Sequence, residues 1–326
     1  MIITRTPFRV SLFGGGSDHS EWFIDNGGCV LSFAIDKYCY LTTRVLPPFF
    51  DHKYRIAYSQ VETVKSIDEI KHPVVRESIR AYSPNLNLEI HHDGDLPARS
   101  GIGSSSAFAV GMIHALLAMN GENPSKPELA DLAIEMEHKI LNENVGWQDQ
   151  IACAVGGINL IEFGPGEFWS NTPITLNPTY LNDALGRMVL MFTGISRMSS
   201  DVSAGLLQNL DTKKQQMLEL SKLATECKSI FEKEGDLSQI GDMLHHSWML
   251  KKEMNSNATT PEIDGIYKRG LDSGALGGKI LGAGGGGFFL FWLANNDRES
   301  FLEKFGPATT VPFRICDEGS KVIHRS

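Results

Sequence analysis

The segment LPARSGIGSSSAFAVG, residues 96–111, constrains this chain more than any other stretch. It runs from Gly101 and Gly103 into three consecutive serines and then into a continuous apolar run. The apolar residues predict a buried helix over about 105–119, which a following Asn-Gly pair would end. Two interpretations are open for the loop before this helix: a serine cap on a buried helix, or a site for phosphate groups.

A phosphate site fits the residue types of this loop. Glycines let the backbone approach a ligand closely, and the free N–H groups at the start of a helix attract an anion. Ser104, Ser105 and Ser106 add hydroxyl groups, which are suited to coordinating Mg²⁺. The chain contains no GxxxxGK[ST] segment, so this is not a Walker A loop. The sequence therefore predicts a triphosphate site of another kind, with the serine cap as the alternative.

A second glycine cluster lies in KILGAGGGGFFLF, residues 279–291. Gly282, Gly284 and Gly287 match the G-x-G-x-x-G pattern, which marks a dinucleotide site only where a helix follows the loop in a βαβ unit. Here the apolar residues after the loop predict a strand, which disfavours a dehydrogenase. The open alternatives are a tight glycine turn and a loop that approaches a ligand or another backbone closely.

A third cluster lies in RVSLFGGGSDHSEWF, residues 9–23, after a strand predicted over 2–13. It brings Ser17, Asp18 and His19 to a glycine turn. Polar groups on such a turn are typical of polyol recognition and equally of a solvated loop.

The composition sets limits on fold and function. With 326 residues, 42% of them hydrophobic, the chain is long enough for two domains, which we predict to be α+β. The formal net charge is −9 and lysine and arginine are scattered, so no nucleic-acid partner is expected. No apolar run reaches the roughly 18 residues of a membrane span. The five cysteines lie far apart, as in a reduced cytoplasmic protein.

Taken together, the three glycine segments resemble the three motifs of the GHMP kinases, the superfamily of galactokinase, homoserine kinase, mevalonate kinase and phosphomevalonate kinase. TPFRVSLFGGGSD is similar to the first motif, LPARSGIGSSSAFA to the second and KILGAGGGGFFLF to the third. The resemblance implies an ATP-binding N-terminal domain over 1–180, related to ribosomal protein S5 domain 2. It also implies a ferredoxin-like C-terminal domain over 181–326, with the active site between the two.

The same resemblance assigns roles to individual residues of an ATP-dependent, Mg²⁺-using kinase. Asp149 in VGWQDQIA matches the family's catalytic aspartate, although an aspartate at a helix start could also be a cap. Arg9 matches its basic partner. Glu137, on a helix predicted from Ser125 to about residue 142, matches a Mg²⁺ ligand beside Ser105. Contacts to ATP are expected from Arg99, Ser100, Gly101, Ile102, Gly103, Ser104, Ser105 and Ser106.

The resemblance also indicates which molecule accepts the phosphoryl group. The GGGSD ending of the first motif is similar to a branch of sugar 1-kinases whose acceptors include D-glycero-D-manno-heptose 7-phosphate and fucose. FTGISRMSSDV (192–202) and HHSWMLKKEMN (245–255) are also similar to this branch. The expected reaction is phosphorylation of the C1 hydroxyl of the heptose 7-phosphate, toward nucleotide-activated heptose for surface polysaccharide. The alternatives are a fucokinase-like sugar 1-kinase and a non-catalytic sugar-sensing protein of the same fold.

A phosphosugar acceptor needs cations where its far phosphate lies. Arg99, Arg197 and Lys279 are the candidates, and Arg197 is the first choice because it follows TGIS. The full set of expected acceptor contacts is Ser17, Asp18, His19, Arg197, Gly284 and Gly285. The oligomeric state, a homodimer included, is left open by the sequence.

Overall fold

The first sheet forms around two long strands near the N-terminus, in a computed structural model that describes residues 1–195 and 213–326. These strands, β1 (Ile2–Phe13) and β2 (Gly28–Val45), pair antiparallel. The sheet has the order β12-β1-β2-β5-β3-β4, with β6 added to β2 and β7 to β6. The remaining strands are β3 (Tyr54–Ala57), β4 (Val61–Val64), β5 (Leu88–Gly94), β6 (Ile158–Gly164), β7 (Phe168–Pro173) and β12 (Lys321–Arg325).

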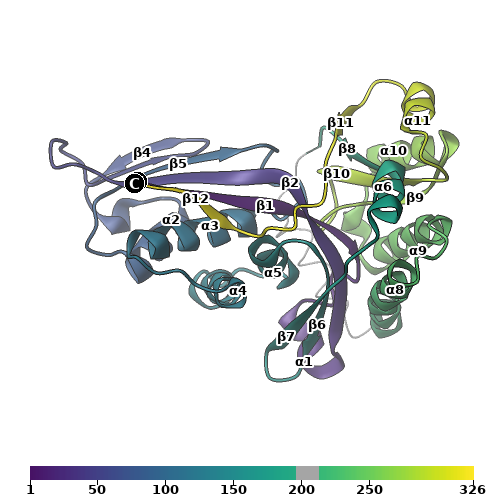
Figure 1. Cartoon of the computed structure of the whole chain (residues 1–326), viewed down its shortest axis with the longest axis horizontal. Coiled ribbons are helices and arrows are strands. Elements are labelled where there is room, and N and C mark those ends of the chain that lie inside the picture. The colour runs from purple at the N-terminus through teal and green to yellow at the C-terminus, as the bar shows by residue number, and fades with distance from the viewer. Residues whose placement is uncertain (196–212) are drawn as a thin grey trace.

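Helices cover one face of this sheet (Figure 1). They are α2 (Pro73–Tyr82), α3 (Ser104–Met119), α4 (Lys126–Glu135) and α5 (Gln148–Val155). The predicted helix after the second glycine segment is confirmed as α3, which is apolar on every side because it is buried between the sheet and its neighbours. Helix α4 begins with a capping box formed by Ser125 and Glu128 and continues as a π-helix, η2 (Met136–Ile140).

The second sheet is antiparallel, with the order β11-β8-β10-β9. Its strands are β8 (Met188–Phe192), β9 (Ala275–Ile280), β10 (Phe288–Leu293) and β11 (Thr309–Val311). The helices of this half are α6 (Pro178–Arg187), α8 (Lys214–Glu232), α9 (Ser238–Met254), α10 (Pro261–Asp272) and α11 (Arg298–Phe305). Because the 282–287 loop leads into strand β10 and not into a helix, the structure removes the basis for a dinucleotide-binding fingerprint.

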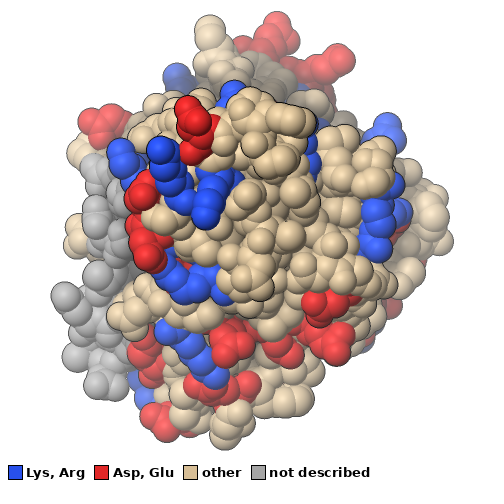
Figure 2. Space-filling view, turned by 90° about the vertical axis from the view of Figure 1, so that its left-hand side faces the viewer, with Lys and Arg blue, Asp and Glu red and all other residues tan. Residues whose placement is uncertain are grey.

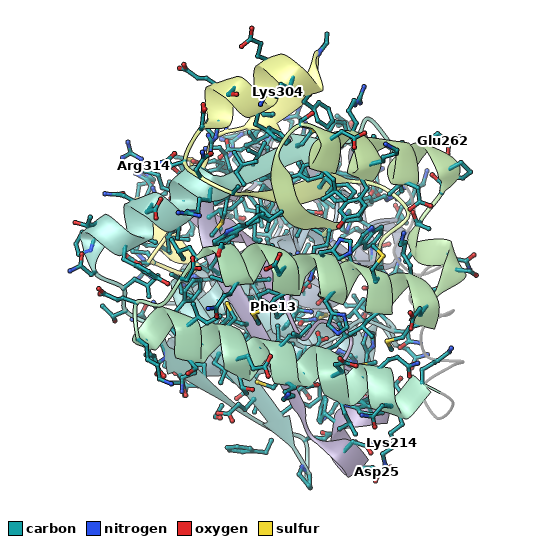
Figure 3. All side chains as sticks on the ribbon, turned by 90° about the vertical axis from the view of Figure 1, so that its right-hand side faces the viewer. Phe13, Asp25, Lys214, Glu262, Lys304 and Arg314 are labelled. Carbon is teal, nitrogen blue, oxygen red and sulfur yellow. The ribbon has the colours of Figure 1, made fainter. Side chains whose placement is uncertain are left out.

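The two halves are joined at more than one place. Helices α8 and α9 lie side by side against the end of β1, with Phe13 behind them (Figure 3). The last segment returns to the first sheet, where Arg325 of β12 stands opposite Ile2 of β1. The short elements α1 (Ser20–Asn26), η1 (Ile67–Glu69) and η4 (Ser256–Ala258) complete the described part of the chain. The predicted α+β class is confirmed.

The structure shows where the charged side chains and the five cysteines lie. On the face at the β4 end of the first sheet, Lys and Arg side chains lie near Asp and Glu side chains, and other residues cover the area between these groups (Figure 2). All five cysteines are buried and carry free thiols. None of the helices in the described ranges has the length and apolar character needed to cross a lipid bilayer.

Candidate active site

Three glycine loops meet between the two sheets. We call 14–19 the first loop, 97–103 the second loop and 281–287 the third loop. The second and third press together backbone to backbone: Phe288 N–H donates to the Ser100 carbonyl at 3.0 Å. A Cβ built on Gly101 would lie 2.4 Å from the Leu281 carbonyl oxygen, and one built on Gly282 would lie 2.6 Å from the Gly101 Cα. Only glycine fits at this contact, which explains the composition of both loops.

Arg9 and Asp149 form the polar centre of the site. Arg9 Nε and Nη2 donate to the two carboxylate oxygens of Asp149, each at 2.7 Å, and Nη1 donates to the Gly101 carbonyl at 2.6 Å. The Arg9 side chain is 3% exposed, whereas that of Asp149 keeps 23% exposure. Burial raises the pKa of Asp149, and the guanidinium of Arg9 acts in the opposite direction. The geometry presents a carboxylate that is held rigidly yet remains accessible.

This carboxylate lies at the N-terminus of α3. Gly103 is the N-cap residue, with φ 72°, and a Cβ there would lie 3.0 Å from Arg9 Cγ and 3.5 Å from Asp149 Oδ2. The cap makes no side-chain hydrogen bond. The first N–H groups of the helix therefore point into the same region as the Arg9–Asp149 pair, which is the arrangement that attracts an anion.

Glu137 lies on the π-helix that follows α4 and is fully buried. Its Oε2 accepts a hydrogen bond from the Ser106 hydroxyl at 2.8 Å and another from the side-chain amide of Gln150. Its Oε1 is buried without a hydrogen-bond partner, and burial raises the pKa of the carboxyl to about 8. Ser106 faces the Glu137 carboxyl, whereas Ser105, the serine predicted to lie beside it, is exposed.

The donor set at Glu137 fits a divalent cation. Mg²⁺ is commonly bound through one or two carboxylates, with water and substrate phosphates as the other ligands. A buried carboxylate oxygen without a partner beside a hydroxyl is a match for such an ion. Within the described ranges, no group of three or more His, Cys, Asp or Glu residues could hold a metal by itself. The residues present therefore fit a cation that is brought in with phosphate.

The first loop is built largely by its own side chains. The Ser17 hydroxyl donates to the Gly14 carbonyl at 2.8 Å and accepts from Cys29 N–H at 3.0 Å, so it closes the turn. The Asp18 carboxylate accepts from Gly16 N–H at 2.8 Å and from Gln148 N–H at 3.2 Å, which joins the loop to the start of α5. His19 is buried, and its Nδ1 has no hydrogen-bond partner. Of these three predicted acceptor contacts, His19 has the free polar atom.

The other predicted contacts lie around the second and third loops. Arg99 is exposed, with φ 58°, and its N–H donates to the Ser104 hydroxyl at 3.2 Å. Gly285 N–H donates to the Ala258 carbonyl at 2.8 Å, and Gly284 packs against the same residue. Ser100 donates its hydroxyl to the Pro97 carbonyl at 2.6 Å, and the carbonyl of buried Ile102 accepts from Arg9 N–H at 3.0 Å. Arg197 lies outside the described residues.

Two lysines join the site from the second half of the chain. Lys279 is 6% exposed, and its ammonium donates to the Leu12 carbonyl at 3.0 Å. Lys251, on α9, donates to the carbonyls of Ile280 and Gly282 at 3.2 and 2.5 Å. Sequence reasoning named Lys279 but missed Lys251, because a lysine on a long amphipathic helix gives no signal that it faces a loop.

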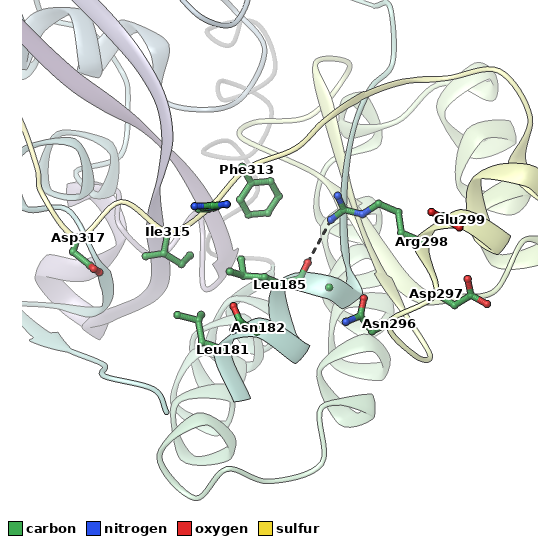
Figure 4. A pocket seen from close by; sticks show the side chains of 12 residues that line it. Leu181, Asn182, Leu185, Asn296, Asp297, Arg298, Glu299, Phe313, Ile315 and Asp317 are labelled. Carbon is green, nitrogen blue, oxygen red and sulfur yellow. Dashed lines mark hydrogen bonds between the residues drawn. The ribbon is translucent and has the colours of Figure 1, made fainter. Parts of the chain in front are cut away.

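A separate cavity of about 960 Å³ lies between α6 and the segments 296–299 and 313–317 (Figure 4). Arg298 crosses it and donates to the Leu185 carbonyl at 3.4 Å. The described residues that line this cavity include no member of the three glycine loops and neither Arg9 nor Asp149. The cavity is therefore not part of the candidate active site.

Comparison with known families agrees with this geometry. Residues 69–157 match the GHMP kinases N terminal domain, and residues 223–308 match the GHMP kinases C terminal domain. The chain belongs to the GHMP kinase family. The resemblance and the fold predicted from the three motifs are thereby confirmed.

Relatives and solved structures extend the likeness over nearly the whole chain. D-glycero-alpha-D-manno-heptose 7-phosphate kinase of Campylobacter jejuni is 29% identical over 308 residues, which cover 90% of this chain and 89% of that enzyme. A bifunctional fucokinase/GDP-fucose pyrophosphorylase of Arabidopsis thaliana is 25% identical over 91% of this chain, which spans 30% of that longer protein. The crystal structure of a D-glycero-D-manno-heptose 1-phosphate kinase from Bacteriodes thetaiotaomicron aligns over 100% of both chains, with a TM-score of 0.82 and 24% identity. At this identity, the structural likeness shows the fold.

Proposed function

We propose that this GHMP kinase transfers the γ-phosphoryl group of ATP to the C1 hydroxyl of D-glycero-D-manno-heptose 7-phosphate, giving the 1,7-bisphosphate and ADP. The observation that carries the proposal is the Arg9–Asp149 pair at the N-terminus of α3, among three glycine loops. The curated relatives named as heptose 7-phosphate kinase and fucokinase support a sugar as the acceptor. The GGGSD ending of the first loop supports the same branch.

Phosphoryl transfer requires that the two substrates are positioned and that a proton is removed from the acceptor hydroxyl. Asp149 accepts the proton of the C1 hydroxyl while the C1 oxygen forms its bond to the γ-phosphorus and the bond from that phosphorus to the ADP oxygen breaks. The C1 hydroxyl is anomeric and more acidic than an ordinary alcohol, so a carboxylate is a sufficient base. Arg9 favours the ionised form of Asp149 and fixes both of its oxygens.

We propose that the nucleotide phosphates bind at the second loop and the first turn of α3, which starts without a side-chain cap on its N–H groups. Glu137 and Ser106 would hold Mg²⁺, which supplies charge neutralisation on the phosphates when it is bound. Ser105, being exposed at the same helix start, is left to contact phosphate.

Glu137→Gln tests the cation site through stability. In EDTA, the melting temperature of the wild type should fall as pH rises from 5 to 8. The folded carboxyl keeps its proton until about pH 8, whereas the unfolded chain releases it near the usual 4.5. The variant lacks this loss and should melt above the wild type at pH 8. Mg²⁺ with ADP should then stabilise the wild type more than the variant.

Glu135→Gln, at an exposed position two residues earlier, is the matched control and should behave like the wild type. A Glu137→Gln protein that responds fully to Mg²⁺ with ADP would remove Glu137 from the cation site.

Arg197→Ala tests the predicted contact to the acceptor phosphate. We expect KM for the heptose 7-phosphate to rise by at least about tenfold, as for the loss of one charge-assisted contact, with KM for ATP little changed. The same variant should be indistinguishable from the wild type on the heptose without phosphate. Equal effects on both substrates of the reaction would assign Arg197 to another role.

The direct test of the function is an ADP-release assay with Mg-ATP. The acceptors are D-glycero-D-manno-heptose 7-phosphate, the same heptose without phosphate, fucose and galactose. Turnover on the 7-phosphate alone would support the proposal. Turnover on fucose would establish the alternative sugar 1-kinase. Binding of a sugar without turnover on any of them would favour the non-catalytic sensor, which the intact Arg9–Asp149 pair argues against.

A further inference from the structure

Two lysine ammonium groups lie in the site without an ion-pair partner among the described residues. Lys279 is buried and Lys251 is partly buried, and both donate to backbone carbonyls. In the described ranges, neither ammonium lies in an ion pair with Asp or Glu. Backbone carbonyls are neutral, so they satisfy hydrogen bonds without cancelling charge. Withdrawing an ammonium from water is unfavourable unless an anion compensates it.

The two lysines belong to one cluster with Arg9. Burial, Lys279 and Arg9 all lower the pKa of Lys251. Burial and Arg9 also lower the pKa of Lys279, to about 7, while Asp18 raises it. Three cations therefore share a region with two carboxylates. Asp149 is paired with Arg9, and Asp18 accepts hydrogen bonds from the backbone N–H groups of Gly16 and Gln148. The cluster has an excess of positive charge that a bound anion would balance.

The carbonyls that these cations contact tie the cluster to all three glycine loops. Lys279 donates to Leu12, just before the first loop, and Arg9 donates to Gly101 of the second. Lys251 donates to Gly282 of the third loop, at the point where that loop presses against Gly101. The excess charge is therefore at the reacting end of the site, beside the base, and not at the far end where a second phosphate on the acceptor would lie.

We propose that Lys251 and Lys279 form a subsite for the phosphoryl group that is transferred, the group that ATP carries and ADP lacks. The inference rests on the proposed function and deepens it by adding two residues from the C-terminal half to the phosphate site. The two ammonium groups complement the helix N–H groups of α3, which approach the phosphates from the N-terminal half. A phosphoryl group held from both halves would also hold the halves together.

The test compares the affinity of Mg²⁺-AMP-PNP and Mg²⁺-ADP by calorimetry in Lys251→Met and Lys279→Met. Methionine keeps the length and apolar stem of lysine and removes its charge. We expect each variant to bind AMP-PNP at least about tenfold more weakly while ADP affinity stays within about twofold, since the lost contact is charge-assisted. Lys252→Met is the matched control, because Lys252 follows Lys251 on α9 but pairs with Asp264 at 3.2 Å. It should bind both nucleotides as the wild type does.

Two further readouts separate this subsite from a structural role. If the lysines serve only to hold the loops, methionine should lower the melting temperature of the ligand-free protein. If instead they supply charge for a bound anion, the melting temperature at pH 6, where Lys279 is protonated, should stay or rise, because an uncompensated charge has been removed. Binding of AMP-PNP by the wild type at pH 8 should also take up a proton, since an anion raises a lysine pKa that is about 7 at Lys279. The Lys279→Met variant should lose that uptake.

The results that would overturn the lysine subsite differ from the one that would contradict the proposed function. Equal loss of AMP-PNP and ADP affinity, or a lowered melting temperature with both affinities intact, would overturn the subsite. Weakened binding of the heptose 7-phosphate with AMP-PNP unaffected would also overturn it and move the lysines to the acceptor phosphate. A wild-type protein that binds neither nucleotide would contradict the proposed function itself.

Discussion

Replacing Asp149 with asparagine is expected to lower kcat by about 10² to 10⁴-fold, the usual contribution of a general base. Asparagine has the same shape, so the helix start and the Arg9 side chain should remain in place. It cannot accept the C1 proton, and its amide nitrogen faces an Arg9 donor that it cannot satisfy. The measurement is ADP release at saturating Mg-ATP and acceptor.

The control for this change is Asp131→Asn, which makes the same replacement on α4, where the carboxylate accepts from Trp169 Nε1 at 2.7 Å. It should leave kcat unchanged. Affinity for Mg²⁺-ADP, measured on both variants, shows that the nucleotide site has survived. An Asp149→Asn enzyme with more than about a tenth of the wild-type kcat would exclude Asp149 as the base, given the size of general-base effects.

Gly101→Ala should cause the largest loss of stability at the site. The new Cβ would meet the Leu281 carbonyl, and φ at this residue is +80°. An L-residue in this conformation costs about 1–2 kcal/mol by itself. The clash between two backbones adds to that cost, so we expect a total loss of about 3 kcal/mol or more in the free energy of unfolding. Nucleotide affinity should fall as well, because the second and third loops can no longer close together.

Gly166→Ala separates the cost of the backbone conformation from the cost of the clash between the loops. Gly166 has φ +77°, and a Cβ there meets nothing within 4 Å, so this variant carries the conformational cost alone. Denaturant unfolding of both variants gives the difference, which measures the contact between the loops. Equal losses of stability in the two variants would show that the second and third loops are not packed against each other in solution.

Several elements could be predicted because their signals are local. The helix α3, the capping box at Ser125 and the strand after the third loop each depend on residues within one or two turns of chain. The rejection of a dinucleotide fingerprint followed from the same kind of signal. Apolar β-branched or aromatic runs and glycine punctuation specify an element type before any tertiary contact forms.

Local sequence patterns could not show which serine of α3 faces Glu137. Helix α3 is apolar on every side, so periodicity cannot tell which serine faces Glu137. The π-helix at 136–140 inserts an extra residue into its turn and changes the face on which Glu137 lies. Both effects arise from packing, and together they select Ser106 over Ser105.

The sequence by itself determined the chemistry of the site: three glycine loops, a serine-rich helix start and the candidate pair Arg9 and Asp149. The tertiary structure decided which atoms meet. It pairs Arg9 with Asp149 across 140 residues, and it brings Lys251 to Gly282. It also returns the last strand to the first sheet. The physical reason is range: backbone preferences act between neighbours in the chain, whereas contacts between distant residues depend on how whole elements pack.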